Sequence, residues 1–252
     1  SPAPVGVADW QRCRLGQRLD VVVVVAITGL IPTQIENVKQ ALRRHRDMYA
    51  GTSASVQLHV LAHGVVGTQC HVSHYTSPSL DRVAAFVERL HTPRGAWSGS
   101  GDSAAAPLQR ETNVLHALAA LHRDPGGRTR LALDRRVLCF VVTGVGPYGA
   151  SGLITPEHKA QVESERSALR SLGLVADGSN VHARDVIRRI AQKRGGRITL
   201  VPVLSNVGGV CSDFYAEAAR STRGLLLRTS RPQSGADDKL CHVLATLLGS
   251  TW

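Results

Sequence analysis

The sequence has few aromatic residues, and it lacks any long apolar run. Only 4% of its 252 residues are aromatic, so few side chains are available for stacking on exposed nucleic-acid bases. No segment approaches the roughly 18 consecutive apolar residues that a membrane span needs, and no membrane insertion is expected. The hydrophobic content of 43% is nevertheless enough for one sizeable core. A single globular domain is therefore predicted.

Cysteines at metal-binding spacing are also missing. The five cysteines, Cys13, Cys70, Cys139, Cys211 and Cys241, include no C-x-x-C pair, which argues against a structural zinc site. Cys139 lies inside an apolar strand and is expected to be a small buried hydrophobe. Cys13 precedes the first predicted strand and Cys241 falls in the last predicted helix, so a disulfide between them would join the two ends of the fold. That bridge would indicate a secreted or cell-surface protein, and without it an intracellular location stays open.

Motifs for catalysis are absent as well. The chain contains neither a G-x-S-x-G elbow nor an H-E-x-x-H pair, and its 11 histidines are scattered. His59 and His63 fall near one predicted strand and His71 and His74 near the next, where we expect surface-facing strand positions rather than a metal cluster. The sequence predicts that the protein is not an enzyme.

The charge is strongly positive but dispersed. The formal net charge is +11, a balance that often indicates a polyanionic partner such as nucleic acid. The densest basic runs, at 43–46 and 184–194, both fall on predicted helices, where they are expected to form solvated faces. Contact with a polyanion through these helices is retained as the alternative hypothesis.

Strands and helices alternate along the chain. The run "LDVVVVVAI" at 19–27 is continuously apolar, as in a central parallel strand covered on both faces. The pattern predicts an α/β fold with a doubly wound, mostly parallel sheet flanked by helices and with one antiparallel edge strand. Residues 1–18 are expected to form an N-terminal extension and 19–252 a single domain with a flexible loop at about 92–107. The other predicted strands are 55–65, 68–76, 135–143, 197–205 and 225–229, and the predicted helices are 32–49, 77–91, 110–123, 155–173, 181–196, 212–224 and 236–249.

A glycine-rich loop follows the strand at 135–143. The segment "CFVVTGVGPYG" contains Gly144-x-Gly146-x-x-Gly149, the spacing of a dinucleotide-binding loop. Such a loop normally follows the first strand and opens directly into a helix, whereas this one lies in mid-chain and its helix begins seven residues past Gly149. Pro147 also removes a backbone N–H that a phosphate would need. No nucleotide or other cofactor is expected.

The order of elements over residues 19–249 resembles the von Willebrand factor type A domain. In that family a divalent cation is held by a D-x-S-x-S motif after the first strand, a Thr in a second loop and an Asp after the fourth strand. In this chain "AITGLI" at 26–31 falls on the first motif. The resemblance implies a degenerate metal-ion-dependent adhesion site with no bound metal, because a hard cation needs several oxygen ligands and usually carboxylate charge. The residues that align with the five ligand positions are Ala26, Thr28, Leu30, Thr112 and Gly144.

The resemblance also implies a binding module rather than a catalyst. The expected partner is a protein, such as a matrix component, a surface protein or a subunit of a complex, bound through adhesion or scaffolding. Ligands of open α/β sheets gather at the carboxyl ends of the strands, which predicts the contact surface. An intracellular scaffold that contacts nucleic acid through its Arg-rich helices is the alternative. The predicted partner-contact residues are Thr28, Gly29, Trp97, Thr112, Thr143, Gly146, Tyr148 and Asn206.

Overall fold

The structure is a computed structural model that describes most of the chain between residues 19 and 229. The predicted N-terminal extension, the loop at about 92–107, the predicted helix at 236–249 and both cysteines of the predicted disulfide lie outside the described residues. No helix in the described part of the chain combines the length and apolarity needed to cross a membrane. The described ranges are 19–27, 32–49, 56–66, 69–76, 79–91, 111–122, 131, 135–148, 156–176, 182–193, 195–205 and 209–229.

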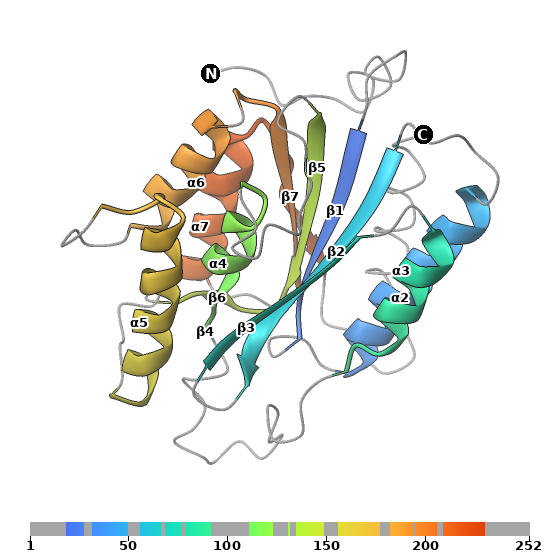
Figure 1. The fold of residues 1–252 in the computed structure, drawn as a ribbon, viewed down its shortest axis with the longest axis horizontal. Coiled ribbons are helices and arrows are strands. Elements are labelled where there is room, and N and C mark those ends of the chain that lie inside the picture. Colours follow the sequence, from blue (N-terminus) through green and yellow to red (C-terminus); the bar gives the residue numbers. More distant parts are fainter. Residues whose placement is uncertain are drawn as a thin grey trace.

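One six-stranded sheet forms the centre of the molecule (Figure 1). Its strand order is β3-β2-β1-β5-β7-β8, and every neighbouring pair is parallel except β2 with β3. The predicted α/β class, with a mostly parallel sheet and one antiparallel edge strand, is confirmed. The strands are β1 (Leu19–Ala26), β2 (Val56–Val66), β3 (Gln69–Thr76), β5 (Arg136–Thr143), β7 (Ile198–Ser205) and β8 (Leu227–Thr229).

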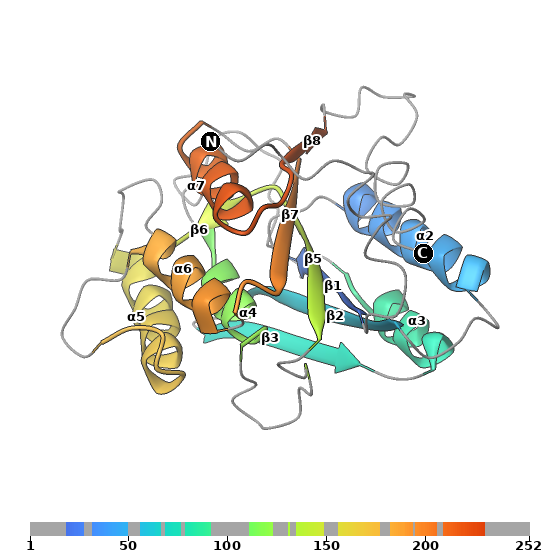
Figure 2. The same cartoon turned by 90° about the horizontal axis from the view of Figure 1, so that it is seen from above.

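Helices cover both faces of this sheet (Figures 1 and 2). The apolar run of β1 explains the arrangement, because successive side chains of a strand point to opposite faces. Val22 and Val24 belong to one core cluster, whereas Val21, Val23 and Val25 belong to the other. One layer holds α2 (Pro32–Tyr49) and α3 (Leu80–Glu88), and the other holds α4 (Val114–Ala119), α5 (Pro156–Ser171), α6 (Ala183–Lys193) and α7 (Gly209–Ser221).

Glycines end two of these helices. Gly173 has a φ of +65° and donates its N–H to the carbonyl of Arg170 at 2.8 Å just after α5, as the sequence predicted. Gly195 and Gly196 have φ values of +57° and +72° after α6. In that turn the Gly196 N–H reaches back to the carbonyl of Ala191 at 3.0 Å. Both turns satisfy carbonyls that a helix end would otherwise leave unpaired.

The predicted helix at 110–123 is wrong at its beginning. Residues Glu111–Thr112 form the short strand β4, which pairs in parallel with β6 (Gly146–Pro147), and α4 starts only at Val114. This second sheet holds the glycine loop against the segment before α4. Helical periodicity alone could not reveal β4, because its pairing partner lies more than thirty residues along the chain.

A buried ion pair lies at the amino end of β1. Arg135 Nε is 2.7 Å from Asp20 Oδ1, and the Asp20 side chain is fully buried. His59 Nε2 lies 3.6 Å from the same carboxylate oxygen and is also buried. The prediction that His59 faces the surface is therefore wrong. A strand in mid-sheet is covered on both faces, so its polar residues are buried with its apolar ones.

Candidate functional site

The candidate site lies at the carboxyl edge of the parallel strands, where the sequence placed the contact surface. β1 ends at Ala26 and β5 at Thr143, and β6 begins three residues after β5. The two-stranded sheet extends the edge there, and the Tyr148 N–H donates to the carbonyl of Thr112 at 3.2 Å. Segments distant in sequence are thereby joined around the ends of β1 and β5.

Hydrogen bonds fix the glycine loop in one conformation. The Thr143 hydroxyl donates to the carbonyl of Val145 at 2.9 Å and accepts the Val145 N–H at 3.1 Å. The phenol of Tyr215, on α7, donates to the same carbonyl at 2.8 Å. Burial raises the pKa of Tyr215 above its ordinary value, so the phenol keeps the proton that it donates. Gly144 lies half-buried inside this loop.

Ala26, the last residue of β1, is a neighbour of His63 on β2. They are register partners in the parallel pair, and the Ile27 N–H donates to the His63 carbonyl at 2.8 Å. Val24 and Leu61, two residues earlier on each strand, belong to the core cluster beneath the α4–α7 layer. Because side chains alternate along a strand, Ala26 and His63 face the same layer.

The imidazole of His63 contacts the Thr112 hydroxyl. His63 Nδ1 lies 3.2 Å from Thr112 Oγ1, and that hydroxyl donates to Asn113 Oδ1 at 3.2 Å. All three side chains are fully buried. Burial lowers the pKa of His63 to about 4, an effect to which nearby His116 adds and which a hydrogen bond to Asn113 opposes. The ring is therefore neutral at physiological pH.

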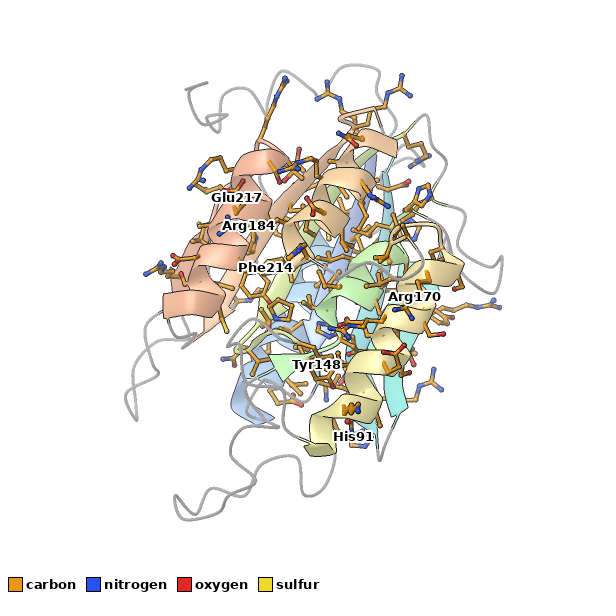
Figure 3. The ribbon with its side chains drawn as sticks, turned by 90° about the vertical axis from the view of Figure 1, so that its left-hand side faces the viewer. His91, Tyr148, Arg170, Arg184, Phe214 and Glu217 are labelled. Atoms are coloured by element: carbon orange, nitrogen blue, oxygen red, sulfur yellow. The ribbon has the colours of Figure 1, made fainter. Side chains whose placement is uncertain are left out.

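The layer above this cluster contains a buried acid. Glu165 on α5 is buried, and its Oε1 accepts the backbone N–H of His116 at 3.1 Å. Burial also lowers the pKa of His116. Figure 3 views this layer and labels Tyr148 and Phe214, which are buried, and Arg184 on α6, which is exposed. Among the described residues, no three His, Cys, Asp or Glu side chains are grouped so that they could hold a metal ion.

The structure brings several predicted site residues together. Ala26, Thr112, Thr143, Gly146 and Tyr148 are all buried at this edge. In this conformation their side chains are not accessible for direct contact with a partner. The remaining predicted residues, Thr28, Gly29, Leu30, Trp97 and Asn206, lie outside the described residues, as do Cys13 and Cys241.

Sequence reasoning missed two members of the cluster, His63 and Asn113. His63 was expected to face the surface, and this is wrong because β2 is covered on both faces and the ring is fully buried. Asn113 follows directly after Thr112, which aligns with a ligand position of the family, so the sequence could have placed Asn113 near the site. Contact between Thr112 and His63, 49 residues apart, depends on the three-dimensional arrangement.

Comparisons with known proteins identify similar folds but no relatives in sequence. No protein-family model matches the chain, and a search of curated proteins finds no match. Among solved structures, the pilus adhesin SpaC from Lactobacillus rhamnosus GG aligns with a TM-score of 0.53 and 8% identity, over 94% of this chain and 31% of that chain. BatB from Bacteroides thetaiotaomicron aligns with a TM-score of 0.49 and 10% identity, over 92% and 98% of the two chains. The SpRpn10 VWA domain aligns with a TM-score of 0.41 and 10% identity, over 92% and 95%.

Proposed function

We propose that this chain, which has a von Willebrand factor A-like α/β fold, is a non-catalytic protein-interaction module that uses no metal ion. Its action is adhesive or scaffolding, and its partner is a protein bound at the carboxyl edge of the sheet. In open α/β sheets this edge is where ligands gather, since loops from several strands meet there.

The burial and hydrogen bonding of the Thr112 hydroxyl are the main observation behind the proposal. Thr112 aligns with a metal-ligating threonine of the family, yet its hydroxyl is buried and engaged by His63 and Asn113. The aligned positions Ala26 and Gly144 supply no side-chain oxygen. A divalent cation would lack carboxylate ligands from these positions and would have to displace an existing hydrogen bond.

The burial of the edge divides its residues into two roles. Thr112, Thr143, Gly146 and Tyr148 are buried and are assigned to support. Direct contact is assigned to the half-buried Gly144 and to four predicted residues outside the described part, Thr28, Gly29, Trp97 and Asn206. Contact residues in loops that a rigid scaffold positions are a common arrangement in binding domains.

Site-specific photo-cross-linking tests this assignment. A photoreactive phenylalanine analogue replaces Gly144 in one variant and the exposed Gln192 on α6 in a matched control. We expect one defined protein adduct from position 144, formed equally in Mg²⁺ and in EDTA, and none from position 192. An adduct that needs the cation, or a melting temperature raised by Mg²⁺, Mn²⁺ or Ca²⁺, would refute metal independence.

The alternative is an intracellular domain that contacts a polyanion through its Arg-rich helices. Arg184, Arg188 and Arg189 lie on α6, and Arg188 and Arg189 are exposed there, which favours it. Two of them also have partners within the chain, since Arg188 pairs with Asp185 at 3.2 Å and Arg189 donates to the Leu174 carbonyl at 3.1 Å. Submicromolar binding of a single-stranded oligonucleotide at physiological salt, lost on R188E/R189E, would favour this alternative over the protein-binding proposal.

The location of the protein depends on Cys13 and Cys241. We propose a secreted or cell-surface location in which these two cysteines are paired. Thiol counting in denaturant without reductant distinguishes the cases: fewer than five free thiols of the five cysteines supports the bridge, and five supports the intracellular alternative.

A further inference from the structure

His63 links several separate segments of the carboxyl edge. Its carbonyl accepts the N–H of Ile27, at the end of β1, at 2.8 Å. Its imidazole contacts the Thr112 hydroxyl on β4, and the Thr112 carbonyl accepts the N–H of Tyr148, just after β6. Strands β1, β2, β4 and β6 are thus connected through one histidine and one threonine.

The direction of the His63–Thr112 hydrogen bond follows from counting protons. A threonine hydroxyl has a single proton, and that of Thr112 is donated to Asn113 Oδ1. The oxygen of Thr112 is then left to accept from His63, which places the imidazole proton on Nδ1, where the hydrogen bond of the ring to Asn113 also lies. A neutral imidazole has only one N–H, so Nε2 is a bare lone pair. Consistently, Nε2 is buried and has no hydrogen-bond partner among the described residues.

Ala26 explains why a histidine fits at this place. Its methyl group faces the same layer as the imidazole of its register partner, and both side chains have 0% exposure. A longer side chain at position 26 would compete with the ring for this buried volume, because protein interiors are close-packed. The small residue and the buried histidine are therefore complementary.

We propose that His63 is the positioning residue of the partner-binding edge, and that its Nδ1–H gives the Thr112 oxygen the electropositive partner that a cation provides in a metal-dependent site. The hydrogen bond from His63 then holds Thr112 and the edge in order, which is the role that a metal ion has in a metal-dependent site. The inference rests on the proposed function in so far as this edge is the one that binds the partner. His63 touches no partner itself, since it acts through Thr112 and Tyr148.

Two substitutions test the Nδ1–H donor of His63 separately from the rest of the imidazole ring. His63→Asn keeps an N–H donor near the position of Nδ1, whereas His63→Gln keeps one near Nε2 and loses the donor to Thr112. The readout is amide hydrogen exchange of Tyr148, whose N–H is bonded to Thr112, measured by NMR in the isolated protein. We expect exchange at Tyr148 to be about tenfold faster in His63→Gln than in His63→Asn, the effect of losing one hydrogen bond. The Val137 amide, bonded to the Arg197 carbonyl at the opposite edge, is the internal control and should change little.

The wild-type protein supplies a test that does not depend on the folding of any variant. Nitrogen NMR of His63 should show a protonated Nδ1 and an unprotonated Nε2 at neutral pH. A proton on Nε2, or equal Tyr148 exchange in the two variants, would overturn the inference. Neither measurement uses a partner, so this inference can fail while the proposed function stands. Conversely, failure of the Gly144 cross-link would refute the proposed function and leave the role of His63 in ordering the edge intact.

Discussion

Ala26 and His63 are register partners on the parallel strands β1 and β2, and both side chains are fully buried on the same face of the sheet. This proximity determines what an acidic residue at position 26 would do. A carboxylate beside an imidazole favours the protonated ring, so the two would form an ion pair. A metal site rebuilt at this edge must therefore compete with His63.

Rebuilding the aligned ligand set tests this competition. The set is A26D, L30S and G144D, compared with and without His63→Ser. With His63 removed, we expect a cation at ten times its Kd to raise the melting temperature by about 3 °C or more, because it binds only the folded state. With His63 retained, the shift should be smaller, since the imidazolium already neutralises the carboxylate introduced at position 26.

Scanning fluorimetry in Mg²⁺ and in EDTA provides the measurement, with the parent chain as control. The parent should show no difference between the two solutions. If both rebuilt variants fold but neither responds to Mg²⁺ or Mn²⁺, then positions 26, 30 and 144 do not converge with Thr112. The alignment to the family's metal site would then be wrong.

The fold was largely predictable because its strongest signals are local. The run of five valines at 21–25 predicts a strand covered on both faces, and these residues divide between the two core clusters. Gly173 ends α5 as predicted, because a helix end at a positive φ favours glycine. Such features depend on neighbouring residues and are readable without a structure.

The site was only partly predictable because its contacts are non-local. The resemblance placed Ala26, Thr112 and Gly144 near one edge, but no local pattern marks the contact of His63 with Thr112 or the pairing of Glu111–Thr112 with Gly146–Pro147. The sequence of the predicted strand at 55–65, which contains His63, also gives no information on whether that strand has one covered face or two. That depends on the position of β2 in the sheet, which the complete topology determines.

The stability of the protein should depend on pH through His63. Its pKa is about 4 in the folded chain against an ordinary value of about 6.5, so between these values the unfolded chain binds a proton that the folded chain does not. The contribution of the neutral ring to the free energy of unfolding is fully present above about pH 6.5. It is lost as the pH falls through 4, which lowers the free energy of unfolding by up to about 3 kcal/mol. Urea unfolding from pH 7.5 to pH 4.5 measures it. In His63→Asn the part of the pH dependence of the free energy of unfolding that comes from His63 should vanish. An unchanged pH dependence would show that the ring is not buried and neutral.

Removal of one partner from the ion pair between Asp20 and Arg135 should strongly lower the free energy of unfolding. Asp20→Asn removes the carboxylate that is paired with the largely buried guanidinium of Arg135, and we expect a loss of about 3–5 kcal/mol in the free energy of unfolding. Glu88→Gln is the matched control. It removes the carboxylate bound by Arg43 at 2.6 Å on the surface, where the side chains are 39% and 42% exposed, and should cost about 1 kcal/mol or less. Equal losses in the two variants would mean that the Asp20 carboxylate is solvated.

Gly224 should tolerate no side chain, because the chain after α7 passes directly over the backbone of β7. A Cβ at this position would lie 1.7 Å from the Leu200 carbonyl oxygen and 2.8 Å from its carbon. These are backbone atoms of β7, which pairs with β5 at this position, and they cannot move aside as a flexible side chain would. The close approach is fixed on both sides, since the Gly224 N–H donates to the Ala219 carbonyl at 2.7 Å and the Leu200 N–H donates to the Thr222 hydroxyl at 3.0 Å.

We therefore expect Gly224→Ala to lower the free energy of unfolding by more than about 4 kcal/mol, or to prevent folding, since the end of α7 must lift away from β7. Gly195→Ala separates this steric effect from ordinary backbone strain. Gly195 has a φ of +57° but no atom within 4 Å of the added Cβ, so its substitution should cost only about 1–2 kcal/mol. Urea unfolding of both variants gives the comparison. A loss for Gly224→Ala no larger than that for Gly195→Ala would show that α7 and β7 are less closely packed than the structure places them.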